Sequence, residues 1–118
     1  MPVRGLPKLE ARWRRERLFR ERRSAELRRT VLEAGVPVLR RYGVSRAWLF
    51  GSVAAGAAGP GSDVDILAMP VPAEVFWPLR RDLEAALGCP LDLCTQDDDP
   101  AFVRKIQQRG ELIHDVQP

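Results

Sequence analysis

Two neighbouring stretches decide the fold of this chain: Leu49-Phe50-Gly51-Ser52-Val53-Ala54-Ala55-Gly56 and, after a short glycine-rich run, Ser62-Asp63-Val64-Asp65-Ile66-Leu67. The apolar residues before Gly51 predict a short buried strand, which ends in a glycine–serine turn. Gly59-Pro60-Gly61 predicts a loop, and residues 63–69 predict a second strand. Polar side chains are therefore expected where the first strand ends and the second begins.

The rest of the chain predicts further helices and strands around this pair. Residues 8–42 have apolar side chains at helical spacing, and Gly35 and Pro37 are expected to kink or divide that helix. After the second strand, the pattern predicts a helix at 73–87, a strand at 91–95, a helix at 100–109 and a weaker strand at 111–116. This order predicts a small α/β domain.

The composition fits one soluble domain. The chain has 118 residues, of which 45% are hydrophobic and 30% charged. We expect no membrane span, because no apolar run approaches the roughly 20 residues that crossing a bilayer requires. The first five residues lack the apolar segment of a secretory signal, so we expect a cytoplasmic protein. The two cysteines, Cys89 and Cys94, do not have zinc-ligand spacing and are expected to be reduced thiols.

Charge is distributed unevenly along the chain. Residues 1–30 carry eleven Lys or Arg against four Glu, a net +7, whereas the remainder carries eight against twelve acids, a net −4. We therefore predict a basic, helical N-terminal arm at 1–30 and a folded domain at 31–118. The arm has two interpretations: a solvated helix with ion pairs between its Arg and Glu side chains, or a surface that binds an acidic partner or nucleic acid.

Asp63 and Asp65 are the first candidates for chemistry. Residues i and i+2 of a strand project from one face about 6.6 Å apart, so the two carboxylates can converge on divalent metal. No Lys or Arg lies between residues 47 and 79 to neutralise them locally. Magnesium fits best, because it takes carboxylate and phosphate oxygens. The alternative is that Ser62-Asp63 only turns the loop and Asp65 is merely exposed.

The Gly51-Ser52 turn and Asp92 strengthen this interpretation. Glycine at the end of a buried strand lets the backbone approach a phosphate, and Ser52 offers a hydroxyl. Alternatively, this is a tight turn with a capping serine. Asp92 lies in the apolar strand Leu91-Asp92-Leu93-Cys94, where a buried carboxylate would be costly without a role. Together, turn, loop and acids indicate chemistry on a nucleoside triphosphate.

The pattern Gly51-Ser52, Gly56, Ser62-Asp63-Val64-Asp65 and Asp92 resembles the minimal nucleotidyltransferases of the DNA polymerase beta-like superfamily. The resemblance extends from about residue 31 to 115. It implies a nucleotidyltransferase fold, with a small mixed β-sheet backed by helices. It also implies that Gly51, Ser52 and Ser62 bind ATP or another nucleoside triphosphate, and that the three aspartates bind Mg²⁺ and serve catalysis.

The resemblance further implies a partner. Relatives of this size commonly pair with a HEPN-domain protein as the antitoxin of an RNA-cleaving toxin, and transfer AMP from ATP to a hydroxyl of that partner. One alternative is an antitoxin that neutralises its partner by binding alone. Transfer to a small molecule such as an aminoglycoside is a third possibility, and oligomer formation is left open.

This chain departs from the family pattern just after Gly51-Ser52. Many relatives have basic residues there, whereas this sequence has Val53-Ala54-Ala55. We expect either weak activity or positive charge supplied from elsewhere, by Arg80, Arg81 or a partner.

Overall fold

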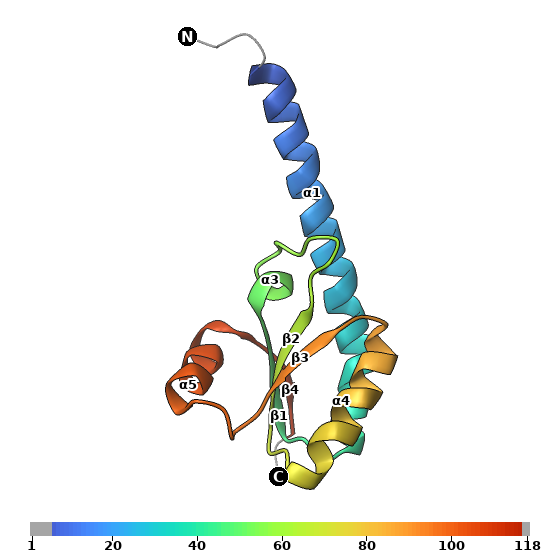
Figure 1. Ribbon diagram of the computed structural model, residues 1–118, viewed down its shortest axis with the longest axis vertical. Coiled ribbons are helices and arrows are strands. Elements are labelled where there is room, and N and C mark those ends of the chain that lie inside the picture. The colour runs from blue at the N-terminus through green and yellow to red at the C-terminus, as the bar shows by residue number, and fades with distance from the viewer. Residues whose placement is uncertain (1–5, 117–118) are drawn as a thin grey trace.

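The computed structural model describes residues 6–116 of the chain. The helical elements and strands are α1 (Leu6–Thr30), η1 (Val31–Gly35), α2 (Val36–Arg41), β1 (Arg46–Phe50), α3 (Gly51–Ala54), β2 (Val64–Met69), α4 (Ala73–Leu87), β3 (Leu91–Cys94), α5 (Pro100–Arg109) and β4 (Glu111–Asp115). They form a small mixed sheet with helices on both faces (Figure 1). The predicted α/β fold is confirmed.

The four strands lie in the order β3-β2-β1-β4. β1 pairs antiparallel with both β2 and β4, whereas β2 and β3 are parallel and are connected through α4. The central position of β1 explains its apolar sequence, since both its edges are hydrogen-bonded and both its faces are covered.

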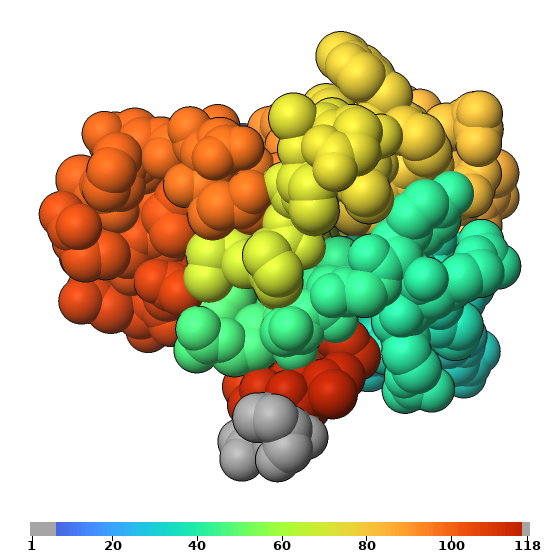
Figure 2. Space-filling model, turned by 90° about the horizontal axis from the view of Figure 1, so that it is seen from below, coloured from blue at the N-terminus to red at the C-terminus, as the bar shows by residue number. Residues whose placement is uncertain are grey.

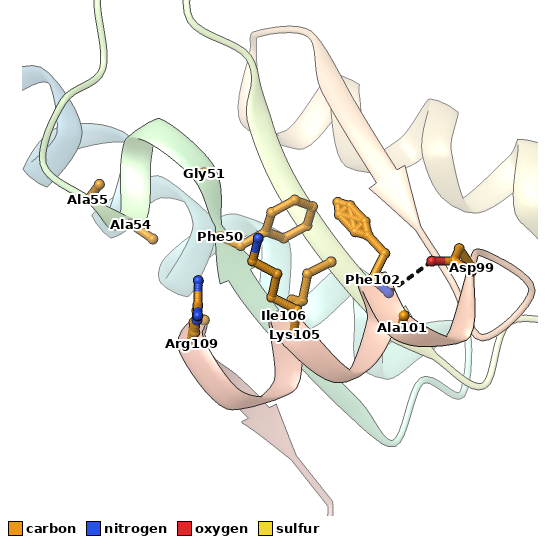
Figure 3. Close-up of a pocket in the computed structure, with 11 residues that line it drawn as sticks. Phe50, Gly51, Ala54, Ala55, Asp99, Ala101, Phe102, Lys105, Ile106 and Arg109 are labelled. Atoms are coloured by element: carbon orange, nitrogen blue, oxygen red, sulfur yellow. Dashed lines mark hydrogen bonds between the residues drawn. The ribbon is translucent and has the colours of Figure 1, made fainter.

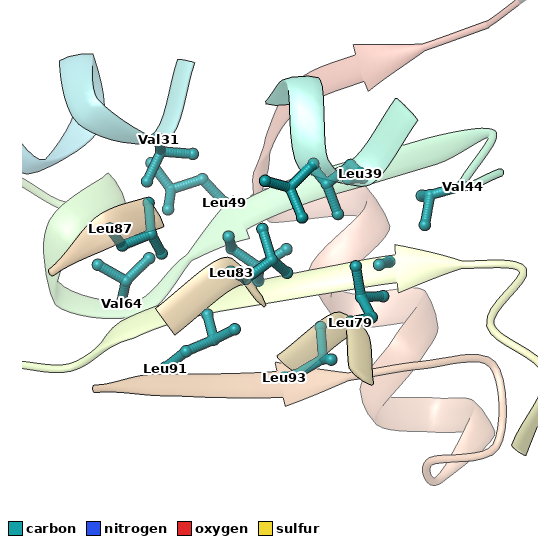
Figure 4. Packing of buried hydrophobic residues seen from close by; sticks show 14 of the residues in the cluster. Val31, Leu39, Val44, Leu49, Val64, Leu79, Leu83, Leu87, Leu91 and Leu93 are labelled. Carbon is teal, nitrogen blue, oxygen red and sulfur yellow. The ribbon is translucent and has the colours of Figure 1, made fainter. Parts of the chain in front are cut away.

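Alternation along the strands divides the core in two. Val64, Ile66 and Leu49 point to the face that is covered by η1, α2 and α4, where most of the buried side chains pack (Figure 4). Trp48 and Leu67 point to the other face, where they pack against α5. Figure 2, viewed from the end away from α1, shows α5 on one side of the sheet and α2 and α4 on the other.

The predicted interruption of the first helix is a π-helical turn. The backbone N–H of Val36 bonds to the carbonyl of Val31, five residues back, instead of four. The interruption lies just before Pro37, which has no N–H to donate and whose ring crowds the preceding turn. The chain stays helical through this turn, so Gly35 and Pro37 divide the helix without ending it.

The basic N-terminal half of α1 extends away from the body (Figure 1), and the molecule measures 59 × 29 × 23 Å. The predicted ion pairs are present on this helix, at 3.2 Å for Arg12–Glu16 and 3.9 Å for Arg23–Glu26. Buried side chains begin at Ser24, whose hydroxyl accepts a hydrogen bond from the N–H of Ala58. Residues 1–5 of the predicted arm lie outside the described residues. None of the helices described between residues 6 and 116 is long and apolar enough to cross a membrane.

Most element boundaries agree with the sequence prediction. The helices at 73–87 and 100–109 match it, and the strands predicted at 63–69, 91–95 and 111–116 each differ by one residue. The short helix α3 begins at Gly51, whose φ of +74° turns the chain out of β1. The helical turn therefore follows the strand directly, without an intervening loop.

Candidate functional site

The strand register places two of the predicted acids side by side. Asp65 of β2 is paired with Asp92 of β3 on one side and with Phe50 of β1 on the other. Directly paired residues project from the same face of a sheet, and here it is the face that α5 covers. Asp63 lies one residue before β2 and is exposed, as is Asp92. The sheet thus presents its carboxylates at one end of the α5 face.

The Gly51 backbone and the Asp65 carboxylate lie close together. A Cβ atom built on Gly51 would lie 2.1 Å from the Oδ2 atom of Asp65. The Asp65 carboxylate therefore occupies the space that any other residue at position 51 would need for its side chain. Glycine is required here for two reasons, because the positive φ also disfavours residues with a Cβ.

The acids repel one another. Asp65 is half-buried, and its pKa is raised from 3.8 to about 6, first by desolvation and then by the charges of Asp92 and Asp63. Among residues 6–116, no Lys or Arg forms an ion pair with any of the three. The site therefore carries negative charge that the described protein does not neutralise.

This donor set fits magnesium. All three side chains offer carboxylate oxygens, and Mg²⁺ usually takes only one or two of these, completing its shell with water and substrate phosphate. Among the described residues, no group of three or more His, Cys, Asp or Glu side chains is arranged so that it could hold a metal ion by itself. The arrangement therefore suits a metal that arrives with a phosphate ligand better than a permanently caged ion.

The two serines differ in their surroundings. The Ser62 hydroxyl accepts a hydrogen bond of 2.7 Å from the N–H of Gly59, which closes the loop before β2. Within the part of the chain that the structure describes, the Ser52 hydroxyl has no hydrogen-bond partner and caps no helix. The Ser52 hydroxyl is therefore free to donate and to accept, whereas the Ser62 hydroxyl already accepts one bond within the protein.

A groove lies beside the Gly51 turn, between α3 and α5 (Figure 3). Its volume is 610 Å³, and Phe50 and Phe102 meet in it edge to face with ring centroids 5.9 Å apart. Lys105 and Arg109 also line it, and their cationic groups point toward α3. Sequence reasoning missed these two residues, although their spacing of four on a helix places them on one face.

The expectation that Arg80 or Arg81 supplies the missing positive charge is wrong. Both residues belong to α4, on the opposite face of the sheet from Asp65. Arg80 pairs with Glu84 at 3.2 Å, and Arg81 pairs with Asp82 at 3.3 Å. Basic residues near Gly51 come from α5 instead, whose start is fixed by Asp99 accepting a hydrogen bond from the N–H of Phe102.

Neither cysteine lies in surroundings that would activate its thiol for catalysis. Both are free thiols, as expected, with Cys94 buried and Cys89 half-buried. Burial and the neighbouring Asp98 raise the pKa of Cys94 to about 11. Since the thiolate is the reactive form, this thiol is inert at neutral pH.

Comparison with known proteins gives a family and a set of similar folds. The model of the family described as "Polymerase beta, Nucleotidyltransferase" matches residues 35–118. A solved structure described as a toxin–antitoxin with AMP-PNP is 24% identical, with a TM-score of 0.63 over 73% of this chain and 74% of that one. Two MntA–HpeT toxin–antitoxin variants are similar: one is 23% identical, with a TM-score of 0.58 over 70% and 71% of the chains. The other is 25% identical, with a TM-score of 0.56 over 70% of each. Curated proteins gave no match.

The raised pKa of Asp65 predicts a pH-dependent cost to stability. Folding disfavours the charged carboxylate, so its contribution destabilises the metal-free protein increasingly as the pH rises from 3.8 through about 6. Asp65→Asn removes that charge and should raise the free energy of unfolding at pH 7.5 by on the order of 1 kcal/mol, since solvent screens a half-exposed group. Urea denaturation of both proteins in the presence of a chelator measures this difference in the free energy of unfolding.

The same measurement well below pH 3.8 is the control, because the wild-type carboxyl is then neutral in both the folded and the unfolded state, and the two proteins should be equally stable. A wild type that is the more stable protein at pH 7.5 would show that Asp65 is not under electrostatic strain.

Proposed function

The chain belongs to the polymerase beta nucleotidyltransferase family, and from this premise we propose that it transfers AMP from ATP to a hydroxyl of a protein partner. The observation that carries the proposal is the contact between the Gly51 turn and the Asp65 carboxylate. The Gly51 turn, whose backbone can approach a phosphate, lies beside the paired carboxylates of Asp65 and Asp92. Nucleotide transfer requires a phosphate-binding turn and metal-binding acids in this proximity.

Each site residue has a proposed part in the reaction. Gly51 and Ser52 bind the triphosphate through backbone and hydroxyl, with Ser62 holding the neighbouring loop in place. Asp63, Asp65 and Asp92 would hold Mg²⁺, which supplies charge neutralisation of the leaving group and a lowered pKa of the acceptor hydroxyl. The charges of Asp92 and Asp63 contribute to the raised pKa of Asp65, so the three carboxylates repel one another. A divalent cation would relieve this repulsion, which favours cation binding.

The transfer is a single in-line displacement. The acceptor oxygen forms a bond to the α-phosphorus while the bond from that phosphorus to the bridging oxygen breaks, so pyrophosphate leaves. Asp92 is exposed at the edge strand of the sheet, where an acceptor can reach it. We assign it the role of taking up the proton that the hydroxyl loses.

The partner is proposed from the similar folds. The three similar structures reported above are of toxin–antitoxin proteins, which supports a toxin partner for this chain as well. We propose a HEPN-domain protein, in accordance with the resemblance of the sequence motif. Asp92 is exposed on edge strand β3, which leaves room for a protein acceptor at this edge of the sheet.

Transfer is tested by incubating the protein, its cognate partner and Mg²⁺ with ATP labelled at the α-phosphate. The wild type should label the partner, and Asp92→Asn should lose at least about 100-fold of the rate, the scale of a lost general base. Thermal unfolding of the two free proteins should be similar, since Asp92 is exposed.

The binding-only alternative gives a different result. If the wild type silences its partner without transferring label, the protein acts as an antitoxin by binding alone. In that case Asp92→Asn should silence the partner as well as the wild type does.

We propose that the extended half of α1 contacts the partner, because it is basic and exposed. Replacing Arg14 and Arg17 by Gln should weaken partner binding at low salt, and the difference should shrink as salt rises, since screening removes long-range attraction. The matched control replaces Arg40 and Arg104, two exposed arginines of the body, and should leave affinity nearly unchanged. Equal losses in the two variants would mean that net charge, not the arm, governs association. Fluorescence anisotropy at several salt concentrations measures the partner affinity of the arm variant and of the control variant.

A further inference from the structure

The groove between α3 and α5 begins at the proposed phosphate turn. Gly51, which touches Asp65, is also one of the residues that line the groove. Proceeding across the sheet, Asp92 is paired with Asp65, and Asp65 with Phe50, which forms part of the groove wall. A chain of phosphates that starts at the acids and passes Gly51 therefore enters this groove.

Two cationic side chains line the groove. Lys105 and Arg109 stand one helical turn apart on the same face of α5, and both are exposed. Within residues 6–116 neither forms an ion pair with an acidic side chain. In Figure 3 their charged ends are directed at α3, across from Ala54.

The opposite wall is built from small, uncharged residues. Ala54 and Ala55 line the groove from α3 and leave space for the two long side chains of α5. The sequence lacks basic residues at this turn, and the structure brings Lys105 and Arg109 to the same place from a different element. The cations thus stand where the polyphosphate of a nucleotide would need them.

We propose that Lys105 and Arg109 form the binding subsite for the β- and γ-phosphates of the nucleotide. This inference rests on the proposed function and deepens it, by assigning the terminal phosphates to α5 and not to the turn alone. The groove volume of 610 Å³ is ample for a diphosphate group.

The subsite has a consequence for the reaction. Pyrophosphate is the leaving group, and its negative charge grows as the bond to the α-phosphorus breaks. Cations in contact with its terminal oxygens stabilise that charge, as they do in other phosphoryl transfers. Lys105 and Arg109 would therefore bind substrate and also assist departure of the product.

The test is calorimetric titration with inorganic tripolyphosphate, measured with and without Mg²⁺. The Lys105→Ala, Arg109→Ala double variant should bind tripolyphosphate at least about tenfold more weakly than the wild type. Arg104→Ala is the matched control, because Arg104 is an exposed cation on the same helix outside the groove. It should change affinity by less than about twofold. Lys105→Arg, which keeps the charge, should retain most of the binding.

Two results would overturn the subsite: equal weakening by Arg104→Ala, or no tripolyphosphate binding by the wild type. Failure of the proposed function is a separate outcome. A wild type that binds tripolyphosphate through Lys105 and Arg109 but never transfers AMP retains the subsite and loses the reaction. A wild type that transfers AMP while the double variant binds normally retains the reaction and loses the subsite.

Discussion

The contact between the Gly51 backbone and the Asp65 carboxylate is the constraint on which the site depends. It requires a residue without Cβ at a positive φ, and it requires the first strand to end where the second begins to carry acids. The antiparallel register that pairs Phe50 with Asp65 satisfies the second requirement. The parallel pairing of β2 with β3 then adds Asp92 from the other side. A shift of one residue in either pairing would send these side chains to the opposite face.

The division of the sheet into two faces separates stability from chemistry. The face under η1, α2 and α4 holds the larger apolar core and no acidic side chain of the site. The other face is covered by α5 alone, so its end near Gly51 stays open to solvent and ligand. The carboxylates that repel one another destabilise the fold. The apolar core under η1, α2 and α4 offsets this cost by burying apolar surface.

Much of this could be predicted from the sequence, for identifiable reasons. The strands and helices follow from apolar periodicity and from glycine and proline stops, and Asp63, Asp65 and Asp92 stand out because acids are rare in apolar strands. The cations of α5 could not be predicted, since nothing local relates Lys105 and Arg109 to a turn more than fifty residues earlier. For the same reason, the sequence could not exclude Arg80 and Arg81 as the source of positive charge. They belong to α4, which covers the face of the sheet opposite the three aspartates.

The most direct test of the central claim compares ATP binding in the presence of Mg²⁺ by Gly51→Ala and Gly88→Ala. Both glycines have positive φ, at +74° and +69°, but a Cβ at Gly88 has nothing within 4 Å, whereas at Gly51 it meets the Asp65 carboxylate. Each substitution should cost roughly 1 kcal/mol of backbone strain. Only Gly51→Ala should displace Asp65 and weaken ATP binding, by at least about tenfold. Equal affinity in the two variants would contradict the account.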